Sequence, residues 1–177
     1  MNRRQWIAAS SGLIAATPAI AAAGPPIAPA LHYAFSASVT LGTIIDLGVA
    51  AGARKRIVPI TGGGFSGPAI RGEVLAGGGD WQTTLPDGSA QIHARYSLKA
   101  SDGALIAIDN PGLRRGPAEV LRRLAAGEDL DPALYYFRST PTFDVADRPH
   151  QWLRESLFIG VGARHPASVD IDCFRVG

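Results

Sequence analysis

Short runs of alternating apolar and polar residues fill most of the chain after residue 30, and Gly, Pro, Asp and Asn separate them. Such punctuation at roughly 8–12-residue spacing is typical of an all-β sandwich or barrel. The clearest run is 90–100, where Ile92, Ala94, Tyr96 and Leu98 alternate with polar residues. The same pattern predicts strands over 31–41, 56–61, 69–75, 82–85, 104–109, 134–140, 152–162 and 168–176.

Turns and one helix divide these strands. Residues 86–88 (Pro-Asp-Gly) favour a tight turn, because Pro presets φ and Gly accepts a positive φ. Residues 101–103 (Ser-Asp-Gly) predict a hairpin between 90–100 and the next strand. A short helix is predicted over 117–126, where Pro117 suits the first turn and three apolar residues share a face.

The first 23 residues have the features of a secretory leader. Arg3 and Arg4 precede an apolar, Ala-rich stretch, and small residues at 21–23 suit a signal peptidase. The paired arginines followed by Trp6 resemble a twin-arginine signal, which predicts a periplasmic protein that is not integral to the membrane after cleavage. The alternative is an uncleaved membrane anchor. Residues 24–30 form a Gly/Pro/Ala linker, and 31–177 suits a single domain.

Charge and cysteine content exclude several classes of protein. Of 17 basic residues, Arg3 and Arg4 leave with the leader, while all 15 acidic residues remain, which leaves 15 of each. A balanced chain lacks the basic footprint of a nucleic-acid-binding protein. Only two positive charges are lysines, and arginine suits fixed, bidentate contacts with carboxylates. Cys173 is the only cysteine and is predicted to be a buried apolar residue without a disulfide.

No motif for a cofactor or a metal is visible. The glycine runs 62–64 and 77–79 lack the Lys-Ser/Thr ending and the strand-to-helix setting of a phosphate loop. They are predicted to allow bulges and close strand approach in a curved sheet. The four histidines show no short metal-binding spacing, and the Gly-x-Ser-x-Gly elbow of Ser-His-Asp hydrolases is absent from the sequence. We therefore expect neither cofactor nor metal.

Strand alternation predicts one polar cluster. Arg71 and Glu73 share a face of the predicted strand 69–75, and His93 and Arg95 share a face of 90–100. If these strands pair with the two faces aligned, the four side chains meet. They would line a ligand pocket inside a small barrel. The alternative is the solvated outer face of a half-buried sheet, where the same alternation occurs.

Asp80 and Trp81 follow three glycines and are predicted to lie in a loop. One interpretation places this loop at a barrel mouth, with Trp81 stacking on an aromatic ligand and Asp80 acting as a base or acceptor. The other is a tight turn closed by an Asx hydrogen bond, with Trp81 in the core.

Tyr136 and Arg138 are predicted on the same side of a strand, where a phenol beside a guanidinium could serve as a general acid with a carboxylate clamp. Plain packing and surface contact is the alternative for this pair. Tyr135 and Phe137 face the other way and are predicted to pack. Trp152 suits a core position better than a ligand platform.

Several short segments, taken in order, resemble the family called domain of unknown function 3237. They cover nearly all of 31–176 and are 41–42, 58–63, 65–68, 70–74, 77–81, 94–96, 102–104, 136–138 and 152–153. The resemblance implies a closed antiparallel β-barrel with a lipocalin-like look. It also implies, for a few members, lyase chemistry on lignin-derived aromatic dimers, in which a carboxylate is lost while a cyclic aryl ether opens. His93 departs from the acidic residue that members often carry.

The resulting hypothesis is a cofactor-independent lyase or isomerase that acts on a small aromatic carboxylic acid. Arg71 or Arg95 would hold the carboxylate, Tyr136 or His93 would protonate the leaving oxygen, and Asp80 or Glu73 would handle a proton. Trp81, Arg138 and Trp152 would contact the ligand. The alternatives are a periplasmic barrel that binds a small molecule without altering it, and an assembly role, including a homo-oligomer, through exposed sheet edges.

Overall fold

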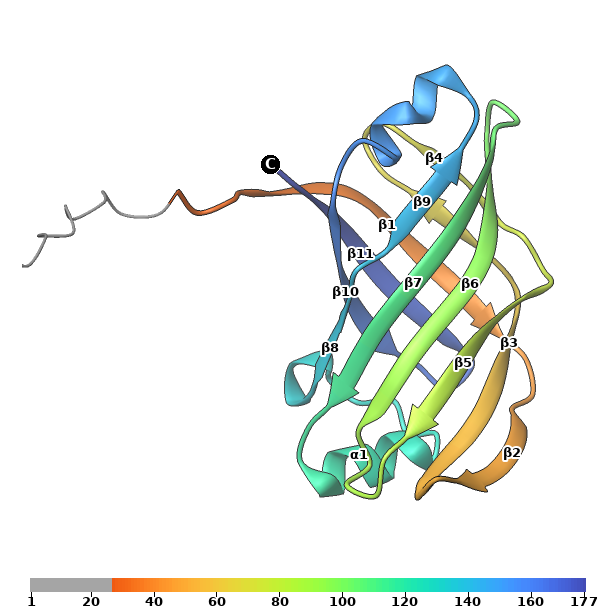
Figure 1. The fold of residues 1–177 in the computed structure, drawn as a ribbon, viewed down its shortest axis with the longest axis vertical. Helices are drawn as coiled ribbons and strands as arrows, with labels where there is room; N and C mark the ends of the chain where they lie inside the picture. Colours follow the sequence, from red (N-terminus) through yellow and green to blue (C-terminus); the bar gives the residue numbers. More distant parts are fainter. Residues whose placement is uncertain (1–26) are drawn as a thin grey trace, which may run out of the picture.

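Strands close into an antiparallel barrel in the computed structural model, which describes residues 27–177 (Figure 1). The wall consists of eight strands: β1 (Leu31–Leu41), β3 (Ala53–Ser66), β5 (Gly78–Thr84), β6 (Ala90–Ala100), β7 (Leu105–Arg115), β8 (Tyr136–Ser139), β10 (Phe158–Arg164) and β11 (Ser168–Val176). Their order is β6-β5-β3-β1-β11-β10-β8-β7, and β7 pairs back with β6. The all-β, closed-barrel prediction is confirmed, whereas the predicted leader lies outside the described residues.

Three shorter strands extend this wall. Strand β2 (Ile45–Ala50) pairs with β3, β4 (Arg71–Val74) lies between β3 and β6, and β9 (Thr142–Val145) pairs with β7. The sequence pattern predicted β4 but neither β2 nor β9. Both are short strands that pair along only one edge, and Gly48 introduces a register shift in β2.

Alternating burial along the strands sets which side chains face the interior. In β6 the residues Ala90, Ile92, Ala94, Tyr96, Leu98 and Ala100 are buried, while the residues between them are exposed or half-buried. The predicted hairpin is also present, since Ala90–Lys99 pairs in register with Leu105–Arg114. The interior of the barrel is therefore the face that carries Tyr96, and the outer face carries His93 and Arg95.

Both ends of the barrel are covered. The helix α1 (Ala118–Ala125) crosses one end, and a 3-10 helix over Arg148–Leu153 lies at the other (Figure 1). Leu121 and Leu124 of α1 pack with Leu130, Tyr135 and Phe137 in one apolar cluster. A larger cluster fills the opposite half and includes Leu153 of the 3-10 helix. The predicted helix over 117–126 and the packing roles of Tyr135 and Phe137 are confirmed.

Two predicted strands include residues that form 3-10 turns. The prediction over 134–140 began too early, because the Asp131 side chain accepts a hydrogen bond from the Ala133 N–H and caps a 3-10 turn over Pro132–Leu134. The prediction over 152–162 joined the end of a 3-10 helix to β10, which starts at Phe158. Short apolar runs do not distinguish a strand from a helical turn, which explains both errors.

The glycine runs allow close approach between strands, as predicted. Gly63 has a φ of 133°, and a Cβ built there would lie 2.1 Å from the Ser38 carbonyl oxygen. A Cβ on Gly78 would lie 2.5 Å from the Tyr96 Cβ. A side chain at either position would therefore force neighbouring strands apart.

Candidate functional site

Polar side chains form a layer inside the barrel, between the two apolar clusters. We call Arg56, Asp80, Gln82, Asn110 and Arg114 the polar layer. Strand register brings them together: β3 pairs with β5 so that Arg56 lies opposite Gln82, and Asp80 lies opposite Ala94, which in turn lies opposite Asn110. Asp80, Gln82, Asn110 and Arg114 are each less than a tenth exposed. Buried polar groups need partners, so their grouping is informative.

Asp80 is the one acidic side chain that is buried among residues 27–177. One carboxylate oxygen accepts a hydrogen bond from the His93 backbone N–H at 3.0 Å, and the other accepts one from the Gln82 amide. Burial raises the pKa of Asp80 above its ordinary value, and these hydrogen bonds oppose the shift only in part. A carboxyl group with a raised pKa can hold a proton closer to neutral pH and act as a general acid.

The two arginines of the polar layer, Arg56 and Arg114, have fewer side-chain hydrogen bonds than Asp80. Arg56 donates from Nε to the Gln82 Oε1 at 2.8 Å. The Nε of Arg114 is buried and has no hydrogen-bond partner within residues 27–177. Burial, together with the positive charges of Arg56 and Arg164, lowers the pKa of Arg114 to about 10. The barrel interior therefore carries positive charge that its own acceptors do not neutralise.

A small cavity of about 30 Å³ adjoins this layer. Asp80, Gln82, Asn110 and Arg114 line its polar side, and Tyr96 lies among the apolar residues that complete the lining. The Asn110 Oδ1 is also buried without a partner within the described residues. A cavity of this size holds a water molecule or two, or one carboxylate group, so a larger ligand requires side chains to move.

The four residues of the predicted cluster, Arg71, Glu73, His93 and Arg95, face outward and do not meet, because β4 pairs with β6 so that Glu73 lies opposite Lys99. Arg71 and Glu73 are exposed, and Glu73 pairs with Lys99 across the outer surface at 3.5 Å. His93 Nε2 and Arg95 Nε each lie 2.8 Å from a different oxygen of Asp109. The pocket interpretation of this cluster is therefore wrong in orientation. The alternative interpretation, a solvated outer face, is correct, because the inward-facing positions of β4 and β6 are occupied by other residues of these strands.

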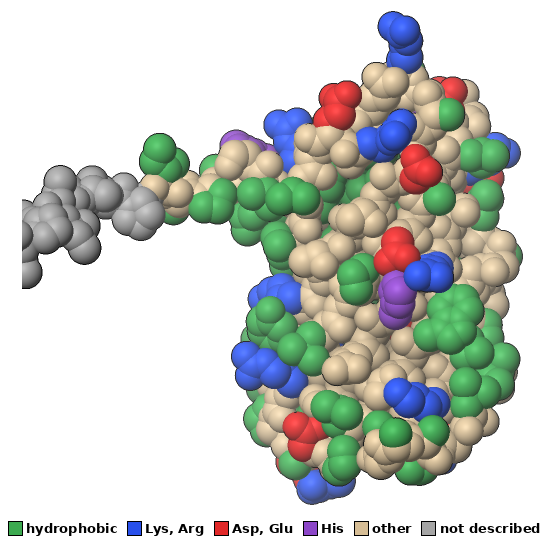
Figure 2. All heavy atoms as spheres, viewed as in Figure 1, with side chains coloured by type: hydrophobic (Ala, Val, Ile, Leu, Met, Phe, Trp, Pro, Cys, Tyr) green, Lys and Arg blue, Asp and Glu red, His purple; other side chains and the backbone are tan. Residues whose placement is uncertain are grey.

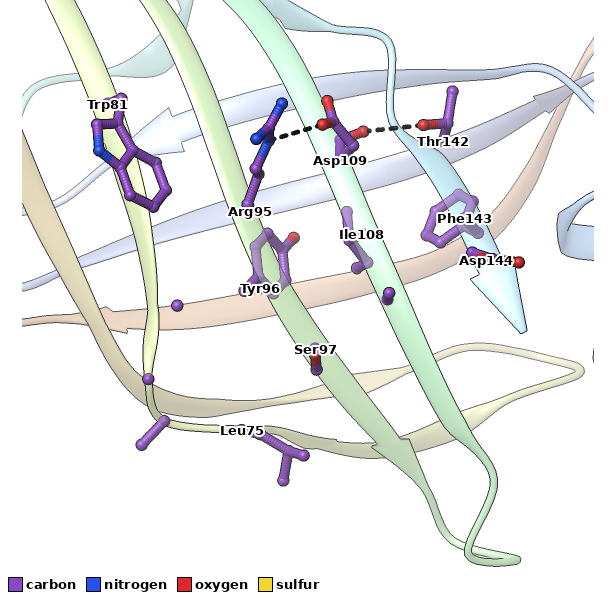
Figure 3. A pocket seen from close by; sticks show the side chains of 14 residues that line it. Leu75, Trp81, Arg95, Tyr96, Ser97, Ile108, Asp109, Thr142, Phe143 and Asp144 are labelled. Atoms are coloured by element: carbon purple, nitrogen blue, oxygen red, sulfur yellow. Dashed lines mark hydrogen bonds and ion pairs between the residues drawn. The ribbon is translucent and has the colours of Figure 1, made fainter. Parts of the chain in front are cut away.

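The loop predicted for Asp80 and Trp81 is part of strand β5, so the two side chains lie on opposite faces. Asp80 points inward, while Trp81 lies on the outer face and is 48% exposed. Trp81 borders a surface groove of about 650 Å³, which Arg95 and Asp109 also line. Figure 3 shows these three residues on successive strands, with Thr142 beyond them on β9. In Figure 2 acidic, basic and histidine side chains meet on this face beside a hydrophobic patch.

Tyr136 and Arg138 also lie on the outer face, side by side as predicted. The Arg138 guanidinium carbon is 5.2 Å from the centroid of the Tyr136 ring, and that of Arg115 is 4.8 Å from it. Trp152 is partly buried against the larger apolar cluster, with its ring centroid 5.9 Å from that of Phe158. None of these three predicted site residues lines the interior cavity.

Sequence reasoning missed the other members of the polar layer. Arg114 and Asn110 were overlooked because the predicted strand ended at Asp109, before Pro111. Strand β7 continues through Pro111 to Arg115, and period-two alternation from Ile108 would have placed Asn110 and Arg114 on the inner face. Gln82 follows Asp80 by two residues, so the same alternation would have placed it on the inner face beside Asp80.

The described part of the chain contains neither a metal-binding group of side chains nor a membrane-spanning helix. Within residues 27–177 no three His, Cys, Asp or Glu side chains are grouped in a way that could hold a metal ion. In the same range no helix has the length and apolar character needed to cross a membrane.

Known proteins place this barrel in a family. The sequence profile of "Protein of unknown function (DUF3237)" matches residues 29–176. The chain belongs to the DUF3237 family. A UPF0311 protein of Rhodopseudomonas palustris (strain TIE-1) is 39% identical over 144 residues, which are 81% of this chain and 94% of that protein.

Solved and curated relatives extend the comparison. The crystal structure of a conserved protein of unknown function from Rhodopseudomonas palustris superposes with a TM-score of 0.84 at 36% identity. The match covers 86% of this DUF3237 chain and 100% of that one. The hydroalkoxylation enzyme phnH of Penicillium herquei is 34% identical over 83 residues, 47% of this chain and 55% of the enzyme. One distant relative of this DUF3237 protein is thus an enzyme.

Proposed function

We propose that the protein is a cofactor-independent lyase or isomerase that acts on a small aromatic carboxylic acid in the polar layer. Asp80 carries this proposal, because its buried carboxyl group has a raised pKa and borders a cavity that is also lined by Arg114, whose Nε has no hydrogen-bond partner within residues 27–177. Perturbed titratable groups in a cavity are typical of catalytic sites. The existence of an enzyme among the relatives supports a catalytic role but not a particular reaction.

The chemistry assigned to the layer is decarboxylation with opening of an aryl ether. The bond to the carboxylate carbon breaks and carbon dioxide leaves. Its electron pair forms a carbon–carbon double bond as the ether C–O bond breaks. The departing phenoxide takes a proton from Asp80, which regains one from water. Interior residues take over the roles first expected of Arg71, Arg95 and Tyr136, because those three lie on the outer surface.

The proposal also includes the location of the protein. We propose that the leader in residues 1–23 directs the protein to the periplasm by the twin-arginine route, which carries folded proteins. A barrel without disulfides suits that route. The single thiol, Cys173, is buried, and burial raises its pKa to about 12, so it is protonated and unreactive.

The first test is to incubate the mature protein with a panel of lignin-derived dimeric aromatic acids and to analyse the products by mass spectrometry. We expect loss of the mass of carbon dioxide, and we expect Asp80→Asn to lower kcat by about 10²–10⁴-fold. The exposed Glu155→Gln serves as the matched control and should keep wild-type turnover. Equal turnover by Asp80→Asn and the wild type would remove Asp80 from the mechanism.

A second candidate function is a carrier that binds an aromatic ligand in the outer groove. The exposed Trp81 beside Arg95 favours it, since an indole and a guanidinium together suit an aromatic acid. In this case the ligand would be recovered unchanged. Its binding would quench tryptophan fluorescence in the wild type but much less in Trp81→Phe.

A further inference from the structure

Three arginines converge in the half of the barrel interior nearer to α1. Arg56 shares the inner face of β3 with Val58 and Ile60, and Arg114 is 7% exposed at the end of β7. Arg164 is the last residue of β10 and lies on the same face as Gly162. A Cβ built on Gly162 would contact the buried Phe137 ring, so this face points into the barrel. Each of Arg56 and Arg164 contributes to lowering the pKa of Arg114, because their like charges lie close to it.

The contacts of these arginines do not neutralise them. Arg56 donates to an uncharged amide, that of Gln82, and Arg164 donates to the Ser168 carbonyl at 3.3 Å. Within residues 27–177 none of the three arginines forms an ion pair at 4.0 Å or less. Asp80 is the buried carboxylate of this region, and its hydrogen bonds come from Gln82 and the His93 N–H. Three positive charges therefore meet at most one negative charge.

Burying a guanidinium without an anion is costly, because the lost hydration is not replaced. The Nε of Arg114 is the clearest case, since it is inaccessible and without a partner among the described residues. Arg114 lines a cavity of about 30 Å³, which could hold a carboxylate group. A planar carboxylate can accept two parallel N–H bonds from one guanidinium, which would give the Arg114 Nε a partner.

We propose that Arg114, with Arg56 and Arg164, forms a carboxylate-binding subsite inside the barrel. Arg114 makes the bidentate contact, and the two half-buried arginines supply the remaining positive charge. The proposal rests on the proposed function only in taking the ligand to be an aromatic acid. It adds that the carboxylate of this acid binds to Arg114. The positive excess of the site excludes neutral ligands and selects anionic ones.

The test compares benzoate with benzamide, which has the same ring without the charge, by calorimetric titration at low salt. The wild type should bind benzoate and not benzamide. Arg114→Met should weaken benzoate binding at least tenfold, while Arg115→Met, on the neighbouring exposed side chain of the same strand, should leave it unchanged. Arg164→Gln, at a half-buried position, replaces Arg114→Met if that variant does not fold, and should also weaken binding.

The thermal stability of the ligand-free protein is a second readout. Arg114→Met should raise Tm in phosphate-free buffer, because it removes a buried charge without a partner. Equal benzoate affinity in Arg114→Met and the wild type, or equal affinity for benzoate and benzamide, would overturn the subsite. Benzoate binding without turnover of any acid would sink the lyase proposal and leave the subsite intact. Turnover with wild-type KM in Arg114→Met would overturn the subsite and leave the lyase proposal intact.

Discussion

Asp80 is the residue on which the proposed chemistry of this barrel depends most. Its folded pKa lies above the value of about 3.9 for an unfolded chain, because burial penalises the charged form. The stability associated with neutral Asp80 is therefore complete below pH 3.9 and is lost as the pH rises through the folded pKa. Ionisation of Asp80 above its folded pKa therefore places a costly charge inside the barrel.

Asp80→Asn should remove this dependence. The Tm of the wild type, relative to that of the variant, should fall as the pH is raised from about 4 to 8, since only the wild type must ionise a buried group. Thermal melts of both proteins across that range measure the difference. Parallel Tm curves would show that the carboxyl group is not desolvated in the folded state.

Single residues were predictable where local pattern decided their place. Cys173 was correctly predicted to be buried, and Tyr136 and Arg138 were correctly placed on one side of a strand. The orientation of Arg95 was left open, because alternation shows which residues share a face but not which face is inside. Closure of the sheet decides that, and closure depends on pairings far apart in sequence.

At the scale of elements, glycines decide how closely strands can approach. Gly63 and Gly64 are neighbours in β3 and differ in this respect. A Cβ at position 63 would lie 2.1 Å from the Ser38 carbonyl oxygen at a φ of 133°, whereas at position 64 its nearest neighbour would be 3.7 Å away.

Gly63→Ala should therefore destabilise the protein by about 2–5 kcal/mol through backbone strain and overpacking. Gly64→Ala is the matched control and should change stability by less than about 1 kcal/mol. Urea unfolding of the two variants gives both values. A similar loss in both variants would mean that the β1–β3 contact at Gly63 is not as close as described.

Elements with strong local signals were predicted well. The hairpin of β6 and β7 has an alternating pattern and a Ser-Asp-Gly turn, and it is present as expected. The end of β7 was misplaced because the predicted strand stopped at Asp109, whereas the strand continues through Pro111 to Arg115. Because Arg114 lies beyond the predicted end of this strand, it was not recognised as a site residue.

At the scale of the whole molecule, the barrel combines two apolar ends with a polar middle. Apolar clusters cover both ends, so the polar layer is enclosed by the fold. Burying unpaired charge lowers stability, and a fold tolerates this cost most readily where the charge serves binding or catalysis. The resemblance found in the sequence predicted the barrel, but the layer becomes visible only when β3, β5, β6 and β7 are aligned.

The central claim is that the ligand binds in the polar layer and not in the outer groove. A crystal of the protein soaked with 4-bromobenzoate tests it directly, because anomalous scattering locates the bromine without ambiguity. We predict a bromine peak inside the barrel and carboxylate density against Arg114, with Asp80 on the same cavity wall. A bromine peak found only beside Trp81 in the outer groove would contradict the account.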